Sequence, residues 1–358
     1  MTEAAEQMVG HVTFEALAGR PVHRSLWTRP LAHIELGRDS DLVVVAPATA
    51  DILAKLANGV ADDLASSTLL AAAAPVLAAP AMNTRMWEHP ATRANVETLR
   101  AAGVELVGPE TGFLAEGETG LGRMAEPDRI FAHVGRRLET DSVLAGRKVV
   151  VTGGPTRAPL DPVRYLGNRS SGRMGHALAA SAWRRGADVV LISGPVSVER
   201  PIGPRLVAVE RSDEMLAALR GEIQDAAVLA MAAAVADFRA SEEQGDKIKR
   251  TGAGLDLRLE PGPDLLAETR EARQAGGVFT LGFALETRDG VENARRKLTE
   301  KGLDMIALNF AGEPDSGFDW PTSRLTLIEP GDAVEELPLL DKREAADRLL
   351  DRIEERLA

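Results

Sequence analysis

Short runs of consecutive apolar residues alternate along the chain with segments of helical periodicity. In the first part, strands are predicted at 41–47 (DLVVVAP), 75–81 (PVLAAPA) and 104–108 (VELVG), and helices near 50–58, 61–72 and 86–102. Strands that are apolar on both faces are typical of a parallel sheet covered by helices on both sides. The pattern therefore predicts an α/β domain with a parallel sheet.

The same alternation starts again after residue 146. Strands are predicted at 148–152, 187–194, 205–210, 226–238, 278–286 and 304–309, and helices near 213–224, 264–273 and 290–301. Residues 323–330 read as a late strand that can run antiparallel, and 342–357 as an amphipathic closing helix. This rhythm predicts a second doubly wound α/β domain.

The periodicity is lost between the two parts, over the segment ETDSVLAG at 139–146. We therefore predict two domains, at 1–140 and 146–358, because boundaries fall where periodic elements stop. Each domain is long enough to bury a core of its own.

The stretch 148–186 carries the clearest chemical signal. Its strand ends at Gly153-Gly154-Pro155, and Ser170-Ser171-Gly172 precede a helical pattern, so we expect the serines to cap a helix. A strand, a glycine turn and a helix N-terminus together bind phosphate or carboxylate oxygens. The GxGxxG pattern is absent, because Gly153 and Gly154 are adjacent and Gly172 follows much later, so a plain Rossmann dehydrogenase is disfavoured.

Polar candidates also follow the predicted strands of the first part. Thr49 and Asp51 come after the strand at 41–47, and Asn83 comes after the strand at 75–81. Ligands of parallel sheets gather beyond the carboxyl ends of the strands. From the residues alone, Asn83 can simply begin a helix, and His33 can be an ordinary partly exposed histidine.

Composition restricts the choice of partners. The chain has 358 residues, a formal net charge of −12 and no cysteine. The negative charge argues against non-specific nucleic-acid binding, and the lack of cysteine excludes disulfides and thiolate metal sites. Neither a signal peptide nor an apolar run long enough to span a membrane is found. We expect a cytoplasmic protein that binds phosphates locally, through helix N-termini, a few lysines or a bound cation.

Three motifs in the second part resemble those of a known family: GGPTRAPLDPVRYLGNRSSGRMG at 153–175, AAAVADF at 232–238 and KIKR at 247–250. They are similar to the phosphopantothenoylcysteine synthetase half of the bifunctional coenzyme A biosynthesis flavoproteins. The residues before them resemble the decarboxylase half. The resemblance covers nearly the whole chain and implies a flavodoxin-like flavoprotein domain at 1–140 and a Rossmann-like synthetase domain at 146–358.

For the second domain, the resemblance implies ligation of L-cysteine to 4′-phosphopantothenate with CTP, through an acyl-cytidylate. It implies that Asn168 handles the acyl-cytidylate, that Asp237 holds Mg²⁺ and that Lys247 closes over the phosphates. The nucleotide pocket is expected to include Met231, Ala232, Ala233, Glu260, Pro261, Gly262, Pro263, Phe283, Lys297 and Lys301. From the residues alone, Lys297 and Lys301 can form a solvated helix face, and Asp237 can merely open a loop.

For the first domain, the resemblance implies FMN-dependent decarboxylation of 4′-phosphopantothenoylcysteine to 4′-phosphopantetheine. Thr49, Asp51 and Asp63 are then expected near the flavin, His33 is the active-site histidine, and Asn83 binds the substrate carboxylate. A histidine titrates near neutrality and can manage a thiol proton, and an asparagine can hold a carboxylate without neutralising it.

Two departures from the family pattern lie in this first domain. Relatives usually begin with another strand, a Gly-rich loop and a helix that cradle the FMN phosphate, and this chain starts just past them, so we expect a truncated flavoprotein domain. Glu116 stands where many relatives carry a cysteine that supplies a proton. A carboxylic acid can donate a proton when burial raises its pKa, and a solvated loop residue is the alternative reading.

The sequence leaves three functions open. The first is the pair of coenzyme A biosynthetic activities, and the second is synthetase activity alone with a non-catalytic, regulatory or binding first half. The third, a nicotinamide-dependent oxidoreductase, is disfavoured by the missing GxGxxG. The resemblance also implies a homo-oligomer, with dimeric synthetase halves and trimeric flavin halves.

Overall fold

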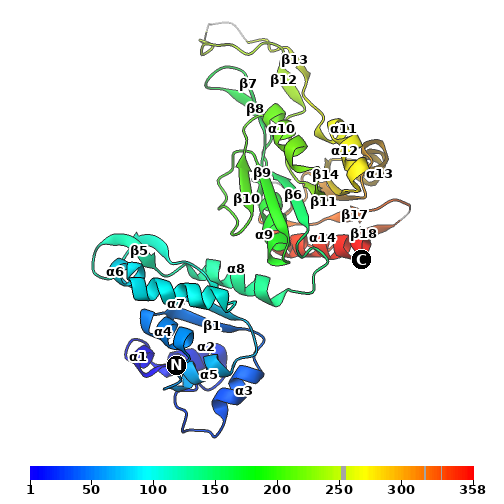
Figure 1. Cartoon of the computed structure of the whole chain (residues 1–358). Helices are drawn as coiled ribbons and strands as arrows, with labels where there is room; N and C mark the ends of the chain where they lie inside the picture. Colours follow the sequence, from blue (N-terminus) through cyan, green and yellow to red (C-terminus); the bar gives the residue numbers. More distant parts are fainter. Residues whose placement is uncertain (251–254, 318–319, 332) are drawn as a thin grey trace. The chain divides into compact units, whose positions relative to one another are not determined.

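The computed structural model describes residues 1–250, 255–317, 320–331 and 333–358. The chain divides into two compact units, unit 1 at Met1–Leu138 and unit 2 at Glu139–Ala358. Figure 1 shows the helices and strands of both units. Each unit is an α/β fold, so the predicted fold class is confirmed.

Unit 1 is built on a small parallel sheet. Its strands are β1 (Val43–Ala48), β2 (Val76–Pro80) and β3 (Glu105–Leu106), hydrogen-bonded in that order. Val43 lies opposite Val76, and Leu77 lies opposite Glu105. All three strands were predicted, although β3 is shorter than the apolar run that indicated it.

Helices surround this sheet. They are α1 (Glu3–Glu6), α2 (His11–Ala18), α3 (Ala32–Arg38), α4 (Ala50–Asn58), α5 (Leu64–Ala71), α6 (Thr84–Glu88), α7 (Pro90–Ala101) and α8 (Pro127–Leu138). The helix predicted over 86–102 is two helices. His89 is extended and Pro90 begins α7, because a proline ring disfavours helical backbone in the residue before it. Leu53, Leu69 and Leu99 form part of the buried core.

An antiparallel hairpin, β4 (Glu110–Phe113) with β5 (Thr119–Arg123), was not predicted. Its glycine-rich sequence lacks the apolar alternation that signals a strand. Gly122 lies against the loop after β2, where a Cβ would be only 2.1 Å from the Met82 carbonyl oxygen. The hairpin therefore packs tightly on the segment that carries Asn83.

Unit 2 contains one large sheet. Its strands are β6 (Lys148–Gly153), β9 (Asp188–Ser193), β10 (Arg205–Ala208), β11 (Ala226–Met231), β14 (Phe279–Glu286), β15 (Met305–Phe310), β17 (Thr326–Ile328) and β18 (Val334–Glu336). The order is β10-β9-β6-β11-β14-β15-β17-β18, and the first six strands are parallel. This is the doubly wound order of a Rossmann fold, and the strand order reverses between β6 and β11. β17 runs antiparallel to β15, as the sequence allowed.

Two helical layers cover the sheet. The helices of unit 2 are α9 (Arg173–Arg184), α10 (Ser212–Glu222), α11 (Leu265–Glu268), α12 (Arg270–Gly276), α13 (Gly290–Lys301) and α14 (Lys342–Leu357). Val149 and Val151 of β6 pack with α9 and α14, and Val150 between them packs with α10, α11 and α13. Within the described ranges, none of the helices combines the length and the apolarity that a bilayer crossing requires.

Two predicted boundaries in unit 2 were wrong. The strand predicted at 226–238 ends at Met231. Beyond it the backbone bends toward the turn at Gly153-Gly154-Pro155, and the Ala234 N–H donates to the Gly154 carbonyl oxygen at 2.9 Å. The helix predicted at 264–273 is interrupted at Thr269, between α11 and α12.

Four short strands complete the part of unit 2 near the predicted motifs. β7 (Arg157–Pro159) pairs with β8 (Tyr165–Gly167), and β12 (Phe238–Ala240) pairs with β13 (Leu259–Pro261). Apart from Phe238, which the predicted strand at 226–238 included, no strand was predicted for these residues. β16 (Thr322–Ser323) and β19 (Leu340–Asp341) form a further pair near the start of α14.

Candidate functional site

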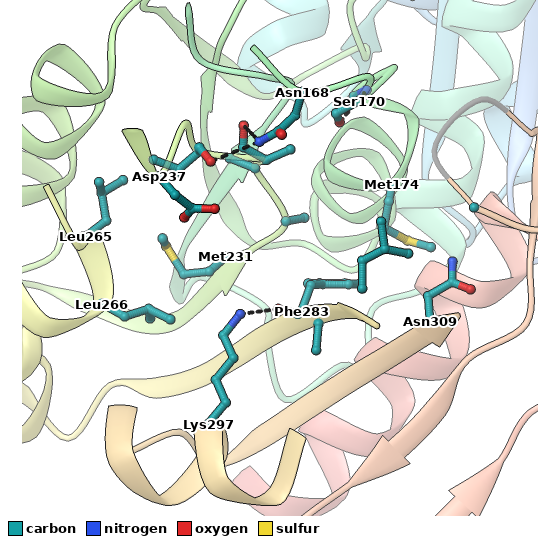
Figure 2. A pocket seen from close by; sticks show the side chains of 18 of the residues that line it. Asn168, Ser170, Met174, Met231, Asp237, Leu265, Leu266, Phe283, Lys297 and Asn309 are labelled. Carbon is teal, nitrogen blue, oxygen red and sulfur yellow. Dashed lines mark hydrogen bonds between the residues drawn. The ribbon is translucent and has the colours of Figure 1, made fainter. Parts of the chain in front are cut away.

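A cavity of about 650 Å³ lies at the carboxyl ends of the central strands of unit 2. Its walls come from the start of α9, the loop after β11, α11, β14 and α13. Figure 2 shows Asn168, Asp237, Phe283 and Lys297 around this space. The cavity therefore occupies the switch point of the sheet, the place where doubly wound folds bind ligands.

The glycine turn and α9 form one wall, as the sequence predicted, but the cap differs. Gly172, in the left-handed conformation (φ +77°), is the N-cap of α9, and none of the described side chains forms a capping hydrogen bond with this helix. Ser170 instead accepts the Gly172 N–H through Oγ at 3.3 Å. A serine cannot easily adopt the positive φ that this turn requires, so the glycine takes the cap position.

Gly153 and Gly175 allow α9 to approach β6 closely. A Cβ on Gly175 would lie 2.8 Å from the Gly153 Cα, so a larger residue would push the helix away from the strand. In the GxGxxG fingerprint, one glycine has this same role of close helix–strand packing. Here the two partners are separated by a long loop, and a search for the short motif therefore misses them.

Asn168 is held against the loop that follows β11. Its Nδ2 donates to the carbonyl oxygens of Ala234 at 3.2 Å and Val235 at 3.0 Å, and the dashed lines in Figure 2 mark these bonds. The same loop continues to Asp237, which also lines the cavity. The structure thus brings together two residues that lie far apart in the sequence.

Two lysines of α13 face the cavity from its other side. Lys297 Nζ donates to the Phe283 carbonyl oxygen at 2.7 Å, and burial lowers the pKa of this lysine. Lys301 Nζ forms an ion pair with Asp264, which also caps α11 by accepting the Ala267 N–H at 3.0 Å. Burial by itself would raise the pKa of Asp264, but the hydrogen bond and charge of Lys301 together with backbone N–H donors outweigh it, and the pKa of Asp264 is lowered. The two lysines are therefore not a solvated helix face.

Eleven of the residues predicted for this site line the cavity: Asn168, Met231, Ala232, Ala233, Asp237, Pro261, Gly262, Pro263, Phe283, Lys297 and Lys301. Two predicted residues, Glu260 and Lys247, are outside the lining. Glu260 pairs with Arg239 in the β12–β13 ladder, where neighbouring side chains point to opposite faces. Lys247 is exposed on the segment between the two strands.

Hydrogen bonds attach the Lys247 segment to the turn between β7 and β8. Asp161, only 2% exposed, accepts the N–H groups of Val163 and Arg164 at 2.7 Å each and that of Ile248 at 3.1 Å. Burial works to raise the pKa of Asp161, but these bonds and the Arg164 guanidinium lower it to about 2. Arg164 also donates to the Ile248 carbonyl oxygen at 3.0 Å. Both the N–H and the carbonyl oxygen of Ile248, the residue after Lys247, are therefore bound by the turn between β7 and β8.

Among the polar lining residues that were not predicted are Asn309, Ser323 and Lys342. Asn309 Nδ2 donates to Ser323 Oγ at 3.0 Å, and the 8% exposed Lys342 donates to the Gly317 carbonyl oxygen at 2.8 Å. Asn309 lies near the carboxyl end of β15, so its position after a predicted strand was a usable signal. Ser323 and Lys342 arrive from the antiparallel end of the unit, where the sequence pattern contains no such signal.

In unit 1, the residues that were expected near the flavin lie at the starts of helices. Thr49 caps α4 by accepting the Ile52 N–H at 3.4 Å, and Asp63 caps α5 through a reciprocal bond with Ser66. Asp51 forms an ion pair with Lys55 at 3.2 Å. Thr49 and Asp51 therefore follow the carboxyl end of β1, where parallel sheets bind ligands, and Asp63 begins the second helix after this strand.

Asn83 and Glu116 contact each other. Asn83 caps α6 by accepting the Arg85 N–H at 2.8 Å, and its Nδ2 donates to Glu116, which is carried between β4 and β5. Glu116 is exposed, and His33 lies half-buried on α3. The hairpin, which the sequence did not predict, is what brings Glu116 to Asn83.

The fold and the cavity define a two-unit α/β protein whose second unit is a Rossmann-like ligand-binding domain. Residues 144–357 match the model of the DNA/pantothenate metabolism flavoprotein C-terminal domain, and residues 1–139 match the flavoprotein model. The chain belongs to the family of coenzyme A biosynthesis bifunctional proteins, with which it aligns along nearly its whole length.

The relatives named coenzyme A biosynthesis bifunctional protein CoaBC include those of three bacteria. The chain is 38% identical to the Bacillus subtilis protein and 41% identical to the Escherichia coli K12 protein, over 99% of this chain and 88% of each relative. It is 45% identical to the Mycobacterium bovis protein over 87% of this chain and 78% of that one. These matches extend across both units.

Two solved structures are similar to unit 2. The crystal structure of the C-terminal domain of coenzyme A biosynthesis bifunctional protein CoaBC covers 61% of this chain and 98% of its own, at 34% identity and a TM-score of 0.52. The DNA/pantothenate metabolism flavoprotein from Streptococcus pneumoniae covers 59% of this chain and 100% of its own, at 21% identity and a TM-score of 0.51. The second match supports the fold alone.

Proposed function

We propose that this chain catalyses two steps of coenzyme A biosynthesis. Unit 2 joins L-cysteine to 4′-phosphopantothenate with CTP, and unit 1 decarboxylates the product to 4′-phosphopantetheine with FMN. The observation that carries the proposal is the cavity at the switch point, where Asn168, Asp237, Lys297 and Lys301 converge in a chain that belongs to this family.

In the ligation, the carboxylate of 4′-phosphopantothenate attacks the α-phosphorus of CTP. A carboxylate–phosphorus bond forms, the bond to the β-phosphate oxygen breaks, and pyrophosphate leaves. The cysteine amine then attacks the acyl carbon, loses a proton and displaces CMP. Both steps concentrate negative charge on phosphoryl oxygens, so fixed cations and hydrogen-bond donors lower the barrier.

The proposed roles follow from where the side chains lie. Lys297 and Lys301 face the phosphates from α13, and the first turn of α9 supplies backbone N–H groups on the opposite wall. Asn168, fixed by two carbonyl groups, is close enough to the β11 loop to orient the acyl-cytidylate. Lys247 lies outside the lining, next to Ile248, whose N–H is bound by Asp161, and its proposed role is to close over the phosphates.

The residues present fit a magnesium ion held mainly by the nucleotide. Asp237 is a carboxylate at the cavity wall, and among the described residues no group of three or more His, Cys, Asp or Glu side chains is placed to hold a metal. Mg²⁺ typically binds through one or two carboxylates together with substrate phosphates. Mg²⁺ would supply neutralisation of phosphate charge, and Asp237 would be its protein ligand.

The residues of unit 1 fit the ring of FMN better than its phosphate. Thr49, Asp63 and Asn83 offer a hydroxyl, a carboxylate and an amide, which suit the polar edge of a flavin ring. Asp63 places negative charge at the start of α5, where it disfavours a phosphate. FMN supplies the two-electron chemistry of the decarboxylation, His33 would manage the thiol proton, and Asn83 would orient the substrate carboxylate. Glu116 contacts Asn83 but is exposed, which matches the reading of a solvated loop residue, so no proton-donor role is proposed for it.

The alternative of a synthetase with a non-catalytic first half is not favoured, because the bifunctional relatives match along 99% of the chain. We also propose that unit 2 pairs as a dimer. Apolar side chains are exposed on the β7–β8 and β12–β13 segments, at Val163, Tyr165, Phe238 and Leu259. The trimeric association of unit 1 is inferred from the family resemblance alone.

The proposal is tested by Lys297→Met in an assay of pyrophosphate release with CTP and 4′-phosphopantothenate. The wild-type chain should release pyrophosphate only when both substrates are present. Loss of a half-buried cation at the phosphates should lower kcat/KM for CTP about tenfold to a hundredfold.

The matched control is Arg296→Gln, which removes a charge from the exposed position immediately before Lys297 in α13. This variant should keep near-normal kinetics. Equal losses in the two variants, or a wild-type chain inactive with CTP, would contradict the proposed function.

A further inference from the structure

Among the described residues, Arg273 of α12 is the largest side chain that is almost completely buried, with 1% of its surface exposed. It lies behind the cavity wall and does not belong to the lining. An arginine keeps its charge inside a protein, so every buried arginine needs a set of acceptors. The identity of those acceptors shows what this guanidinium holds in place.

Four hydrogen bonds connect Arg273 to the elements that surround the cavity. Nη1 donates to the Gly302 carbonyl oxygen at 3.0 Å and to Thr280 Oγ1 at 3.1 Å. Nη2 donates to the carbonyl oxygens of Lys301 at 2.8 Å and Leu266 at 3.0 Å. One planar group therefore joins the C-terminus of α13, the start of β14 and α11.

These partners include residues of the cavity wall itself. Leu266 and Lys301 both line the cavity, and Lys297 lies one turn before Lys301 on the same helix. On the cavity side, the ion pair of Lys301 with Asp264 links α13 to α11 a second time. This pair is partly exposed, and such pairs contribute little. The buried guanidinium is thus the stronger connection between the two walls.

The charge of Arg273 also matters for an anionic ligand. The last carbonyl groups of a helix carry partial negative charge, and those of α13 lie next to the proposed phosphate site. The guanidinium donates hydrogen bonds to two of them and places a positive charge behind them. A neutral residue would leave buried carbonyl groups without donors and a negative helix end near the phosphates.

We propose that Arg273 is a positioning residue for nucleotide binding, which holds the end of α13 against α11 so that Lys297 and Lys301 meet the phosphates of the nucleoside triphosphate. The inference rests on the proposed function of unit 2. Arg273 does not contact the substrate, so its effect is expected in the affinity for CTP rather than in the rate of the chemical step.

Two variants of the full chain separate geometry from charge. Arg273→Met removes both and should raise KM for CTP about tenfold, which corresponds to about 1.4 kcal/mol. KM for 4′-phosphopantothenate should stay nearly constant. Arg273→Lys keeps the charge but not the planar fork, and should raise KM for CTP by a smaller factor. CTP-induced stabilisation against thermal unfolding, measured without the other substrates, should fall in the same order.

Arg185, just after α9, provides a matched control. It is also a buried arginine, and its Nη2 donates to Asp351 of α14 at 2.7 Å. Within the described part of the chain, the Nε atoms of Arg185 and of Arg273 are both buried without a hydrogen-bond partner. Arg185 lies at the end of α9 remote from the cavity, so Arg185→Met should lower stability and leave KM for CTP unchanged.

Three results would overturn the inference. One is an unchanged KM for CTP in folded Arg273→Met, and another is an equal rise in Arg185→Met. The third applies if Arg273→Met does not fold. In that case Arg273→Lys is the test, and a wild-type response of this variant to CTP would overturn the inference. A wild-type chain that neither binds nor uses CTP would instead reject the proposed function, so the two failures are distinguishable.

Discussion

At the residue scale, Asp161 shows how one side chain can organise a loop. Its carboxylate accepts three backbone N–H groups and the Arg164 guanidinium, which is 2.5 Å from Oδ2. Two of the N–H groups belong to its own turn, and the third belongs to Ile248, beside the proposed catalytic Lys247. Loss of this single group should therefore affect both the turn and the distant segment.

Asp161→Asn should lower the melting temperature at neutral pH, because an amide cannot accept all these bonds. The folded chain holds the pKa of Asp161 near 2, below the usual value of 3.8, so the carboxylate stabilises the fold above about pH 4. That contribution is lost as the pH falls from about 4 to about 2. Thermal unfolding of both proteins between pH 7 and pH 3 measures the difference, which should shrink below pH 4.

Asp188→Asn is the control for this experiment, since Asp188 is an exposed carboxylate at the start of β9. Its melting temperature should follow the wild type at every pH. A constant gap between wild type and Asp161→Asn down to pH 3 would contradict the account of Asp161.

At the scale of elements, the packing of α14 on α9 closes one face of the unit 2 sheet. Leu349, Leu350 and Ile353 of α14 are buried together with Leu178 and Ala182 of α9. The two helices come from opposite ends of the unit's sequence, so α14 must dock before α9 is fully covered. The start of α9 is also a wall of the proposed active site.

Leu349→Ala should destabilise the protein by about 2–5 kcal/mol, the usual result of a large-to-small change at a fully buried position. Chemical denaturation monitored by circular dichroism measures this loss. Leu339, 39% exposed before α14, provides the control, and Leu339→Ala should change the free energy of unfolding by less than about 1 kcal/mol. Similar losses in both variants would show that α14 is not packed as described.

At the scale of the whole molecule, the two units have separate hydrophobic cores. The clusters around Leu53 and Leu77 use residues of unit 1, and those around Leu178 and Leu219 use residues of unit 2. A solved C-terminal domain of a relative corresponds to 61% of this chain. Units with cores of their own can fold separately.

A protein limited to residues 139–358 should therefore fold and retain CTP-dependent ligation, with KM for CTP within about twofold of the full chain. The visible absorbance of bound flavin should appear in the full chain and be lost in the shorter protein. An unfolded or inactive 139–358 protein would show that unit 2 depends on unit 1. A full chain without flavin absorbance would contradict the proposed FMN site.

Much of the fold could be predicted from local patterns. The strands at 148–152, 187–194 and 304–309 and the helix at 50–58 were predicted nearly within their observed bounds, because burial of consecutive apolar residues is a local property. The β4–β5 hairpin was missed because glycines supply no apolar alternation. The strand from Ala226 was extended too far, since the apolar run continues where the backbone turns to Gly154.

For the site, the family motifs pointed to Asn168 and Asp237, Lys297 was expected on a helix face toward the nucleotide, and the structure places these three in one cavity. Lys342 and Arg273 could not be found in this way. Lys342 reaches the lining from the antiparallel end of the sheet, and Arg273 lies behind the cavity wall. Neither position is marked by a motif or by periodicity.

The sequence by itself determined the succession of strands and helices, the two-part organisation and the chemistry of the motif residues, because these depend on neighbours along the chain. Only the tertiary structure decided which residues meet. The order β10-β9-β6-β11-β14-β15 places the end of α13 beside α11, and this proximity allows Arg273 to hydrogen-bond to both helices. Contacts between distant segments depend on strand order and helix packing, which no local pattern specifies.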